Sequence, residues 1–198
     1  MPGKRAFTFW FIFCVPLVCA LDATAQTPAP PATRDARVAT RFAKEKPSAW
    51  GEHIAGLYSR VPGDGKQIAL TFDACGRDYA KRPVEASPDY DERLIEFLRK
   101  ERVPATLFLN ARWIAAHPDV ARDLAADPLF DIETHGVRHV PLSVTGRSAY
   151  KVRGTANAAE AVREVSGGAK AVETLTGRPA RFFRPGTAFY DDVAARIV

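Results

Sequence analysis

The sequence predicts an α/β fold in which short parallel strands alternate with helices. Three features support this prediction: apolar runs rich in β-favouring residues recur along the chain, amphipathic helical patterns separate them, and glycine, proline or polar residues end each run. The repeated order of strand and helix favours a parallel sheet or barrel with right-handed crossovers. We see no internal sequence repeat.

The first predicted strand begins at Ile68, after a turn at residues 62–65, and ends before Gly76. Asp73 lies near its carboxyl end. In parallel α/β folds the carboxyl ends of the strands form the ligand-facing edge, so an acid placed there is a candidate catalytic group. A turn or helix cap is the alternative role for such an aspartate.

A helix is predicted from Asp89 to Arg102, after a polar, proline-interrupted loop at residues 77–88. Asp89 and Glu92 have the spacing of a capping box. Pro104 ends the helix. Its predicted apolar face consists of Tyr90, Leu94, Phe97 and Leu98.

Two more strands and two short helices are predicted next. The second strand covers residues 105–110, and the third covers residues 129–134. Between them, helical patterns over residues 112–116 and 119–126 are separated by proline.

A longer helix and a fourth strand are predicted before the end of the sequence. Asn157 and Glu160 form a capping pair, and Gly177 is the expected end of the helix. The pair Gly167-Gly168 lies within this helix, at a cost of roughly 1 kcal/mol per glycine. Residues 180–183 form the predicted fourth strand. The apolar stripe of the helix is Ala161, Val162, Val165, Ala169, Val172 and Leu175.

The first 25 residues have the pattern of a secretory signal peptide. Lys4 and Arg5 precede an uncharged apolar run at residues 6–21, and cleavage is expected after Ala25. A membrane anchor is the alternative, but the run is shorter than the roughly 20 residues that span a bilayer and contains Pro16. We therefore expect export to the periplasm or the extracellular space, without stable membrane insertion.

A lipoprotein anchor at Cys19 is a further alternative, although Val18 is bulkier than the small residue usual at such sites. After the leader, residues 26–36 are rich in Pro, Ala and Thr and are predicted to form a linker. Residues 37–65 are predicted to be an N-terminal extension that packs on the domain. The catalytic domain is predicted over residues 66–198.

Charge and cysteine content narrow the function classes. The chain has a net charge of +5 with no run of like charge, so nothing indicates nucleic-acid binding. Two of its three cysteines lie in the leader, which leaves Cys75 as the one thiol of the exported chain. Such a cysteine is a reactive thiol, an intermolecular bridge, a metal ligand or a small buried apolar residue.

Two further segments follow predicted strands directly. His135 and His139 come after the third strand, and a His-x-x-x-His pair commonly presents two imidazoles to one cation. Arg184 follows the fourth strand and could hold a carboxylate in a fixed geometry and favour its charged form. The alternatives are a coincidental surface histidine pair and an ordinary surface arginine in a proline-glycine turn.

Together these segments resemble the polysaccharide deacetylase family, carbohydrate esterase family four. Thr71-Phe72-Asp73 resembles its first motif, His135 to His139 its second, and Phe183-Arg184-Pro185 its third. The resemblance covers roughly residues 66–198. It implies a distorted (β/α) barrel and metal-dependent hydrolysis of an N-acetyl group on an aminosugar of a polysaccharide, such as a peptidoglycan- or chitin-like glycan.

The resemblance also assigns roles. The acid matching Asp73 is the general base that acts on a water, and the arginine matching Arg184 orients it. The histidines matching His135 and His139 hold a divalent metal, usually zinc. Metal polarisation of the acetyl carbonyl would stabilise the oxygen that becomes negative during attack.

The sequence departs from the family pattern at residue 74. The family usually has a second aspartate here as third metal ligand, whereas this chain has Ala74. Cys75, Asp78, Glu133 or a solvent molecule are the candidate replacements. Cys75 would favour zinc by softness, but we expect its side chain to point away from the neighbouring strand face.

A second departure concerns length. A predicted helix over residues 191–198 reaches the end of the sequence, and the family's later motifs have no counterpart in these residues. Those motifs supply an aromatic pocket wall and a His general acid. We therefore expect a partial chain and an incomplete barrel with open sheet edges. The readings are a metal-dependent deacetylase, a degenerate glycan-binding member, and an α/β domain whose histidines bind nothing.

Overall fold

The computed structural model describes residues 32–60, 65–75 and 90–198. The chain divides into two units, Met1–Pro31 and Ala32–Val198, and only the second is described below. The predicted signal peptide and residues 26–31 of the predicted linker therefore lie outside the described residues, as does Asp89. Within the described ranges, no helix is long and apolar enough to cross a bilayer.

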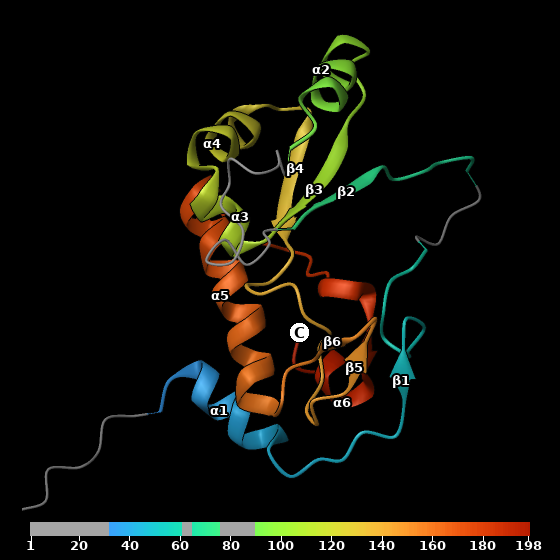
Figure 1. Ribbon diagram of the computed structural model, residues 1–198, viewed down its shortest axis with the longest axis vertical. Coiled ribbons are helices and arrows are strands. Elements are labelled where there is room, and N and C mark those ends of the chain that lie inside the picture. The colour runs from blue at the N-terminus through green and yellow to red at the C-terminus, as the bar shows by residue number, and fades with distance from the viewer. Residues whose placement is uncertain (1–31, 61–64, 76–89) are drawn as a thin grey trace, which may run out of the picture. The chain divides into compact units, whose positions relative to one another are not determined.

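Three parallel strands carry the functional part of the molecule (Figure 1). They are β2 (Thr71–Ala74), β3 (Ala105–Leu109) and β4 (Phe130–Thr134), hydrogen-bonded in that order. All three were predicted at these places, although β2 begins three residues later than predicted. Ile68, the predicted start, is 85% exposed, and residues 65–70 are all exposed. These residues are therefore not buried as a core strand would be.

The predicted fourth strand over residues 180–183 is wrong as a strand, although the segment does lie beside β4. It forms a single parallel bridge between Phe183 and Thr134. The N–H groups of Arg181 and Phe182 donate to the carboxylate of Glu133, at 2.7 and 2.8 Å. These amides are thus satisfied by a side chain, and no strand ladder extends along the segment.

Helices cover one side of the three strands (Figure 1). They are α3 (Ala111–Ala116), α4 (Pro118–Ala126) and α5 (Ala158–Thr176), and both α4 and α5 contact β4. Side chains of these elements and of α2 form the main apolar core, which includes Leu107, Leu109, Trp113, Leu124, Ile132 and Val172.

Helix α2 (Glu92–Lys100) corrects the predicted apolar face. Asp91 caps it by accepting a hydrogen bond from the N–H of Leu94. Ile95 and Leu98 are buried, whereas Phe97 is 57% exposed. Because Ile95 turns toward the sheet, Phe97 points away from it, and its assignment to the apolar face was wrong.

Helix α5 runs without interruption through the glycine pair and ends at Gly177, which has φ +73°. A Cβ on Gly168 would lie 2.5 Å from Thr134 Oγ1 and 2.6 Å from Gly136 Cα. Any side chain at this position would force the helix away from the end of β4. The glycine therefore allows a close approach between α5 and the loop that carries the histidine pair.

The first described residues, from Ala32 onward, belong to the same unit as the three strands. Helix α1 (Arg34–Phe42), capped by the hydroxyl of Thr33, contacts α5. The predicted linker over residues 26–36 therefore extends too far, because its last three residues form the first turn of α1. Strand β1 (Trp50–Gly51) pairs antiparallel with β7 (Tyr190–Asp191).

Short elements complete the unit. Strands β5 (Ser148–Ala149) and β6 (Val152–Arg153) pair antiparallel, and η2 (Gly186–Ala188) is a short turn in which Thr187 and Ala188 have positive φ. Helix α6 (Asp192–Ala195) confirms a helix at the predicted place but is shorter than the predicted 191–198. Over the described residues the parallel strands form an open sheet, as expected for an incomplete barrel.

Candidate active site and metal centre

The candidate site lies at the carboxyl ends of β2 and β4, which we call the carboxyl edge. Asp73 belongs to the end of β2, His135 and His139 to the loop after β4, and Arg184 to the segment bridged to β4. The structure brings these four predicted residues together. They come from three separate parts of the sequence, so the fold rather than local spacing creates the site.

Arg184 holds Asp73 in a defined orientation. Its Nη1 lies 2.6 Å from Asp73 Oδ1, and its Nη2 donates to Thr71 Oγ1 at 3.0 Å. The guanidinium also stacks over the Phe108 ring, 4.1 Å from the centroid. An arginine fixed by a carboxylate, a hydroxyl and an aromatic face has little freedom left. From the sequence, Thr71 was placed in the first motif without a role, and Phe108 was not identified.

His135 is oriented by a backbone carbonyl. Its Nδ1 lies 2.7 Å from the carbonyl oxygen of Arg184, which only accepts hydrogen bonds, so Nδ1 carries the proton. In the neutral ring this leaves a lone pair on Nε2. That Nε2 atom is buried without a hydrogen-bond partner among the described residues, and it lies 3.7 Å from Asp73 Oδ2. Such an arrangement is typical of a metal-binding imidazole.

Burial lowers the pKa of His135, although the nearby carboxylate of Asp73 opposes this shift. Burial likewise lowers the pKa of His139, again against the effect of Asp73. Both rings are therefore neutral near neutral pH. Neutral imidazole is the form that binds a cation.

His139 lies against His135, with ring centroids 4.8 Å apart in an edge-to-face arrangement. Its backbone has φ +60°, a conformation that few residues other than glycine adopt. Gly186 allows a close approach to this residue, because a Cβ there would lie 2.2 Å from the His139 carbonyl carbon. The segment after Arg184 thus packs directly on the histidine loop.

Glu164 of α5 anchors the histidine loop from the other side. Its Oε1 accepts the N–H groups of Val137 and Arg138, at 2.9 and 2.7 Å, and its Oε2 accepts Arg138 Nε at 3.1 Å. The side chain is 2% exposed. Sequence reasoning missed Glu164. Its signal was a charged residue on the buried face of α5, three residues after Ala161.

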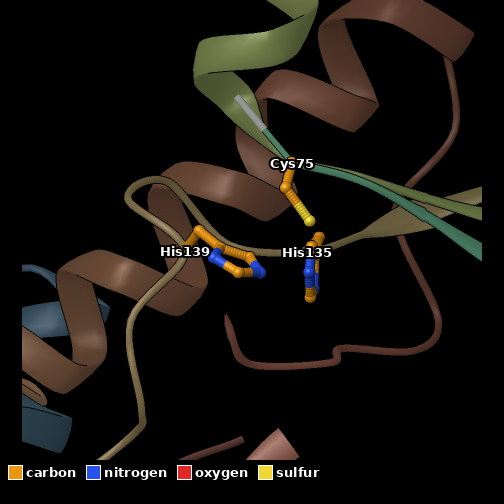
Figure 2. A group of neighbouring side chains, drawn as sticks. All are labelled: Cys75, His135 and His139. Atoms are coloured by element: carbon orange, nitrogen blue, oxygen red, sulfur yellow. The ribbon is translucent and has the colours of Figure 1, made fainter. Parts of the chain in front are cut away.

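Cys75 points into the site, so the expectation that its side chain points away was wrong. Figure 2 shows the thiol and the two imidazoles directed toward one another, and their ligand atoms all lie within 4.8 Å. The physical reason is the alternation of side chains along an extended chain, which places residues 73 and 75 on the same face. Ala74 packs instead against the apolar core.

Among the described residues, the other candidate third ligand, Glu133, does not join this group. Glu133 is fully buried, but its carboxylate is occupied by Arg181 and the amide of Phe182. Asp78 lies outside the described residues. Within the described residues, Cys75, His135 and His139 are the group that could hold a metal ion. One thiolate and two imidazoles are donors that suit zinc, so the residues present fit a divalent metal.

A cavity of about 470 Å³ adjoins the site and is lined by Arg184, Phe108, Leu57 and Tyr190. A larger cavity of about 800 Å³ lies at the amino ends of the strands, beside Pro104 and Leu129. Its lining includes none of the four predicted residues at the carboxyl edge. Of these two cavities, the smaller one shares a residue with the site, Arg184.

Solved structures with a similar fold include a pseudoenzyme of carbohydrate esterase family 4 from Bacillus anthracis. It matches with a TM-score of 0.50 and 22% identity, over 68% of this chain and 40% of its own length. A mutant of that pseudoenzyme with restored enzymatic activity gives 0.50 and 24%, over 68% and 41%. The described chain thus spans about two fifths of these proteins, and the likeness shows the fold.

A comparison with curated proteins gave no match. Residues 60–198, however, match the sequence model of the family described as polysaccharide deacetylase. This range contains β2, β4, the bridged segment and every candidate site residue. The family resemblance predicted from three short motifs is thereby confirmed, and the chain belongs to the polysaccharide deacetylase family.

Proposed function

We propose that this protein is a metal-dependent hydrolase that removes the N-acetyl group from aminosugars of a polysaccharide, releasing acetate. The observation that carries the proposal is the position of Asp73. Its Oδ1 is held by Arg184 at 2.6 Å, while its Oδ2 lies 3.7 Å from Nε2 of His135, an atom with no hydrogen-bond partner among the described residues. One carboxylate oxygen is thus fixed and the other faces the candidate metal centre.

This geometry suits general base catalysis. Asp73 Oδ2 would accept a proton from the water that attacks the acetyl carbonyl carbon. Arg184 maintains the direction of that oxygen through its bond to Oδ1. The carbon–nitrogen bond then breaks, the acetyl group leaves as acetate with the oxygen of the water, and the amine nitrogen takes up the proton that Asp73 Oδ2 accepted. A positioned base of this kind contributes about 10²–10⁴-fold to the rate.

His135 and His139 would hold a divalent ion, with zinc favoured by their nitrogen donors. Such an ion supplies polarisation of the acetyl carbonyl and stabilisation of the developing negative charge. The carbonyl of Arg184 supports this role because it orients His135 through Nδ1. Arg184 therefore contributes through its side chain to the base and through its backbone to the metal centre.

The substrate we propose is a peptidoglycan- or chitin-like glycan. The family supports a polysaccharide, and the cavity beside Arg184 contains both aromatic and apolar side chains suited to a sugar ring. The signal-peptide pattern of the first 25 residues supports export to the periplasm or the extracellular space. Such polymers are found there. We propose no nucleic-acid partner.

A second candidate function is glycan binding without turnover. Ala74 favours it, because the family usually has an aspartate ligand at this position and here a methyl group packs on the apolar core. The similar fold of a pseudoenzyme is compatible with this alternative. Under this alternative the site would recognise the N-acetyl group but release no acetate.

Acetate release from N-acetylated chitooligosaccharides and from peptidoglycan distinguishes the two functions. The full chain loaded with zinc should release acetate, and Asp73→Asn should reduce the rate by about 10²–10⁴-fold. Asp35→Asn, which changes an exposed acid of α1, serves as a matched control and should leave the rate unchanged. Glycan binding without release in the wild-type protein would favour the second function, and equal rates for the wild type and Asp73→Asn would exclude Asp73 as base.

A further inference from the structure

The thiol of Cys75 occupies the place where a third metal donor is needed. We propose that Cys75 binds the metal as a thiolate together with His135 and His139, which makes this a sulfur-containing centre selective for soft and borderline ions such as zinc. The proposal rests on the proposed function for the presence of a metal. It goes further by assigning a ligand of different chemistry from the carboxylate usual in the family.

The first observation is the convergence of the three donors. One ligand atom from each of Cys75, His135 and His139 lies within 4.8 Å of the other two. Figure 2 shows the thiol of Cys75 directed from the end of β2 toward the two rings. Bond lengths of about 2.0–2.3 Å place two donors of a tetrahedral zinc about 3.5 Å apart. Small changes in side-chain torsion would close the difference.

The second observation is independent of the cysteine. His135 Nε2 is buried without a partner among the described residues, and the side chain is 1% exposed. A buried polar atom left in this way is costly, by about 1–3 kcal/mol. The Nδ1 bond to Arg184 leaves the lone pair of Nε2 available. An ion shared with the thiolate would satisfy that lone pair.

The third observation is that the side chains of residues 73–75, at the end of β2, point in alternating directions. Asp73 and Cys75 face the site, whereas Ala74 faces the apolar core. An acid at residue 74 would therefore have to leave that core to reach an ion held by the histidines. The cysteine one residue later supplies a negative donor without this change. Asp73 then remains available as the base.

Charge supports the same assignment. Asp73 is paired with Arg184 at 2.6 Å, so its negative charge is already balanced. With only neutral imidazoles, a divalent ion would keep its full charge beside the buried ring of His135. A thiolate would reduce this charge and would strengthen binding, because sulfur ligands favour zinc over magnesium or manganese. The metal itself favours the deprotonated thiol.

Cobalt(II) binding tests the proposal by absorption spectroscopy, with no need for activity. Titration of the full chain should produce a near-ultraviolet charge-transfer band that requires a thiolate–cobalt bond. Cys75→Ser should lose this band and bind cobalt at least about 10-fold more weakly. The double variant Cys14→Ser/Cys19→Ser is the matched control and should keep the band, since it removes the other two cysteines.

The variant Cys75→Asp tests selectivity. A carboxylate at this position should bind cobalt without the band and should shift the ratio of cadmium to manganese affinity toward manganese by at least about 10-fold. An unchanged ratio would overturn the proposal. Circular dichroism verifies that each variant is folded before titration.

Thiol protection gives a measurement that needs no substitution at residue 75. In the Cys14→Ser/Cys19→Ser background, zinc should slow alkylation of Cys75 by iodoacetamide at least about 10-fold, because a metal-bound thiolate reacts poorly. An unchanged alkylation rate with zinc bound would overturn the proposal.

The outcomes separate this proposal from the proposed function. Cobalt binding that depends on His135 but shows no charge-transfer band would overturn the cysteine ligand and leave the deacetylase in place. Acetate release that persists in Cys75→Ser, with unchanged cobalt affinity, would likewise overturn the cysteine ligand and leave the deacetylase in place. A folded wild-type protein that binds no cobalt, zinc or cadmium would overturn both the thiolate ligand and the metal-dependent reaction.

Discussion

The two strand ends that form the site differ in how firmly they are held. The loop after β4 is fixed from two sides: by Glu164 and Gly168 of α5, and by the segment at Gly186. Within the described residues, the end of β2 pairs with β3, and the side chain of Asp73 is oriented by Arg184. The two histidines are thus pre-organised by packing, whereas the base is positioned mainly by one ion pair.

This difference indicates which changes should affect the whole unit and which should affect the reaction alone. Substitutions around the β4 loop remove buried hydrogen bonds or force backbone apart, so they should lower stability as well as metal affinity. Substitutions at the β2 end should alter the direction of Asp73 with little effect on stability.

Among the substitutions proposed here, Glu164→Ala should disrupt the loop after β4 most strongly. It removes the buried acceptor of two backbone N–H groups and leaves Arg138 with the longer contact to Glu160, at 3.5 Å. We expect a loss of about 3 kcal/mol in the free energy of unfolding, because each amide left without its acceptor costs about 1–3 kcal/mol. Urea denaturation measures this, with Glu96→Ala on the exposed face of α2 as the matched control. A loss no greater than that of the control would show that the loop does not depend on α5.

Arg184→Lys tests the β2 side. Lysine cannot keep the bonds to both Asp73 and Thr71 or the stacking on Phe108. We expect kcat to fall about 100-fold, since misplacement of a catalytic group by about 1 Å has this effect. The free energy of unfolding should change by less than about 1 kcal/mol.

The matched control for this substitution is Arg93→Lys, in the exposed first turn of α2. Kinetics of acetate release and urea denaturation of both variants provide the comparison. A large loss of stability with unchanged kcat would reverse the assignment, because Arg184 would then be a structural rather than a positioning residue.

The sequence was sufficient to predict much of this comparison. The three strands and the convergence of Asp73, His135, His139 and Arg184 follow from local hydrophobic patterns and from the rule that parallel strands end at a common edge. The family match confirms the resemblance based on these residues. Their catalytic roles, zinc and export stay predictions.

The features that the sequence did not predict depend on contacts between residues that are distant in the sequence. Glu133 interrupts the fourth strand by binding amides 48 and 49 residues away. Glu164 anchors a loop 26 and 27 residues before it. No local pattern encodes such pairs. The direction of Cys75 differs in kind, because the alternation of side chains beyond Asp73 could have predicted it.

Gly168→Ala tests the close contact between α5 and the loop after β4. The added Cβ would overlap Thr134 Oγ1 and Gly136, and overpacking of this kind costs about 1–3 kcal/mol. The better helix propensity of alanine offsets about 1 kcal/mol. We expect a net loss of about 1 kcal/mol and a cobalt affinity reduced about 10-fold, since displacement of groups supporting a ligand has this effect.

Gly65→Ala is the matched control, because a Cβ at that position makes only ordinary contacts, with Gln67 at 3.6 Å. Urea denaturation and cobalt titration of both variants measure the two effects. A gain in stability for Gly168→Ala would show that α5 can move away from the loop without cost.

The smallest expected effect lies away from the carboxyl edge, where α6 joins the segment before β1. The carboxylate of Asp192 accepts the N–H of Ala49 at 3.0 Å and the N–H and hydroxyl of Ser48 at 2.8 Å each. These bonds, with that from Ala49 the largest cause, lower the pKa of Asp192 from 3.8 to about 2. The carboxylate form is therefore favoured in the folded state.

Because the folded-state pKa lies below the unfolded value, this stabilisation is complete above about pH 4 and is lost as the pH falls through about 2. Asp192→Asn should reduce the free energy of unfolding by about 1 kcal/mol at pH 7. The difference between the wild type and the variant should disappear near pH 2, as measured by urea denaturation across that range. Cobalt affinity at pH 7 should be unchanged, since α6 contributes no residue to the metal centre. An equal difference at pH 7 and pH 2 would mean that the effect comes from packing rather than from charge.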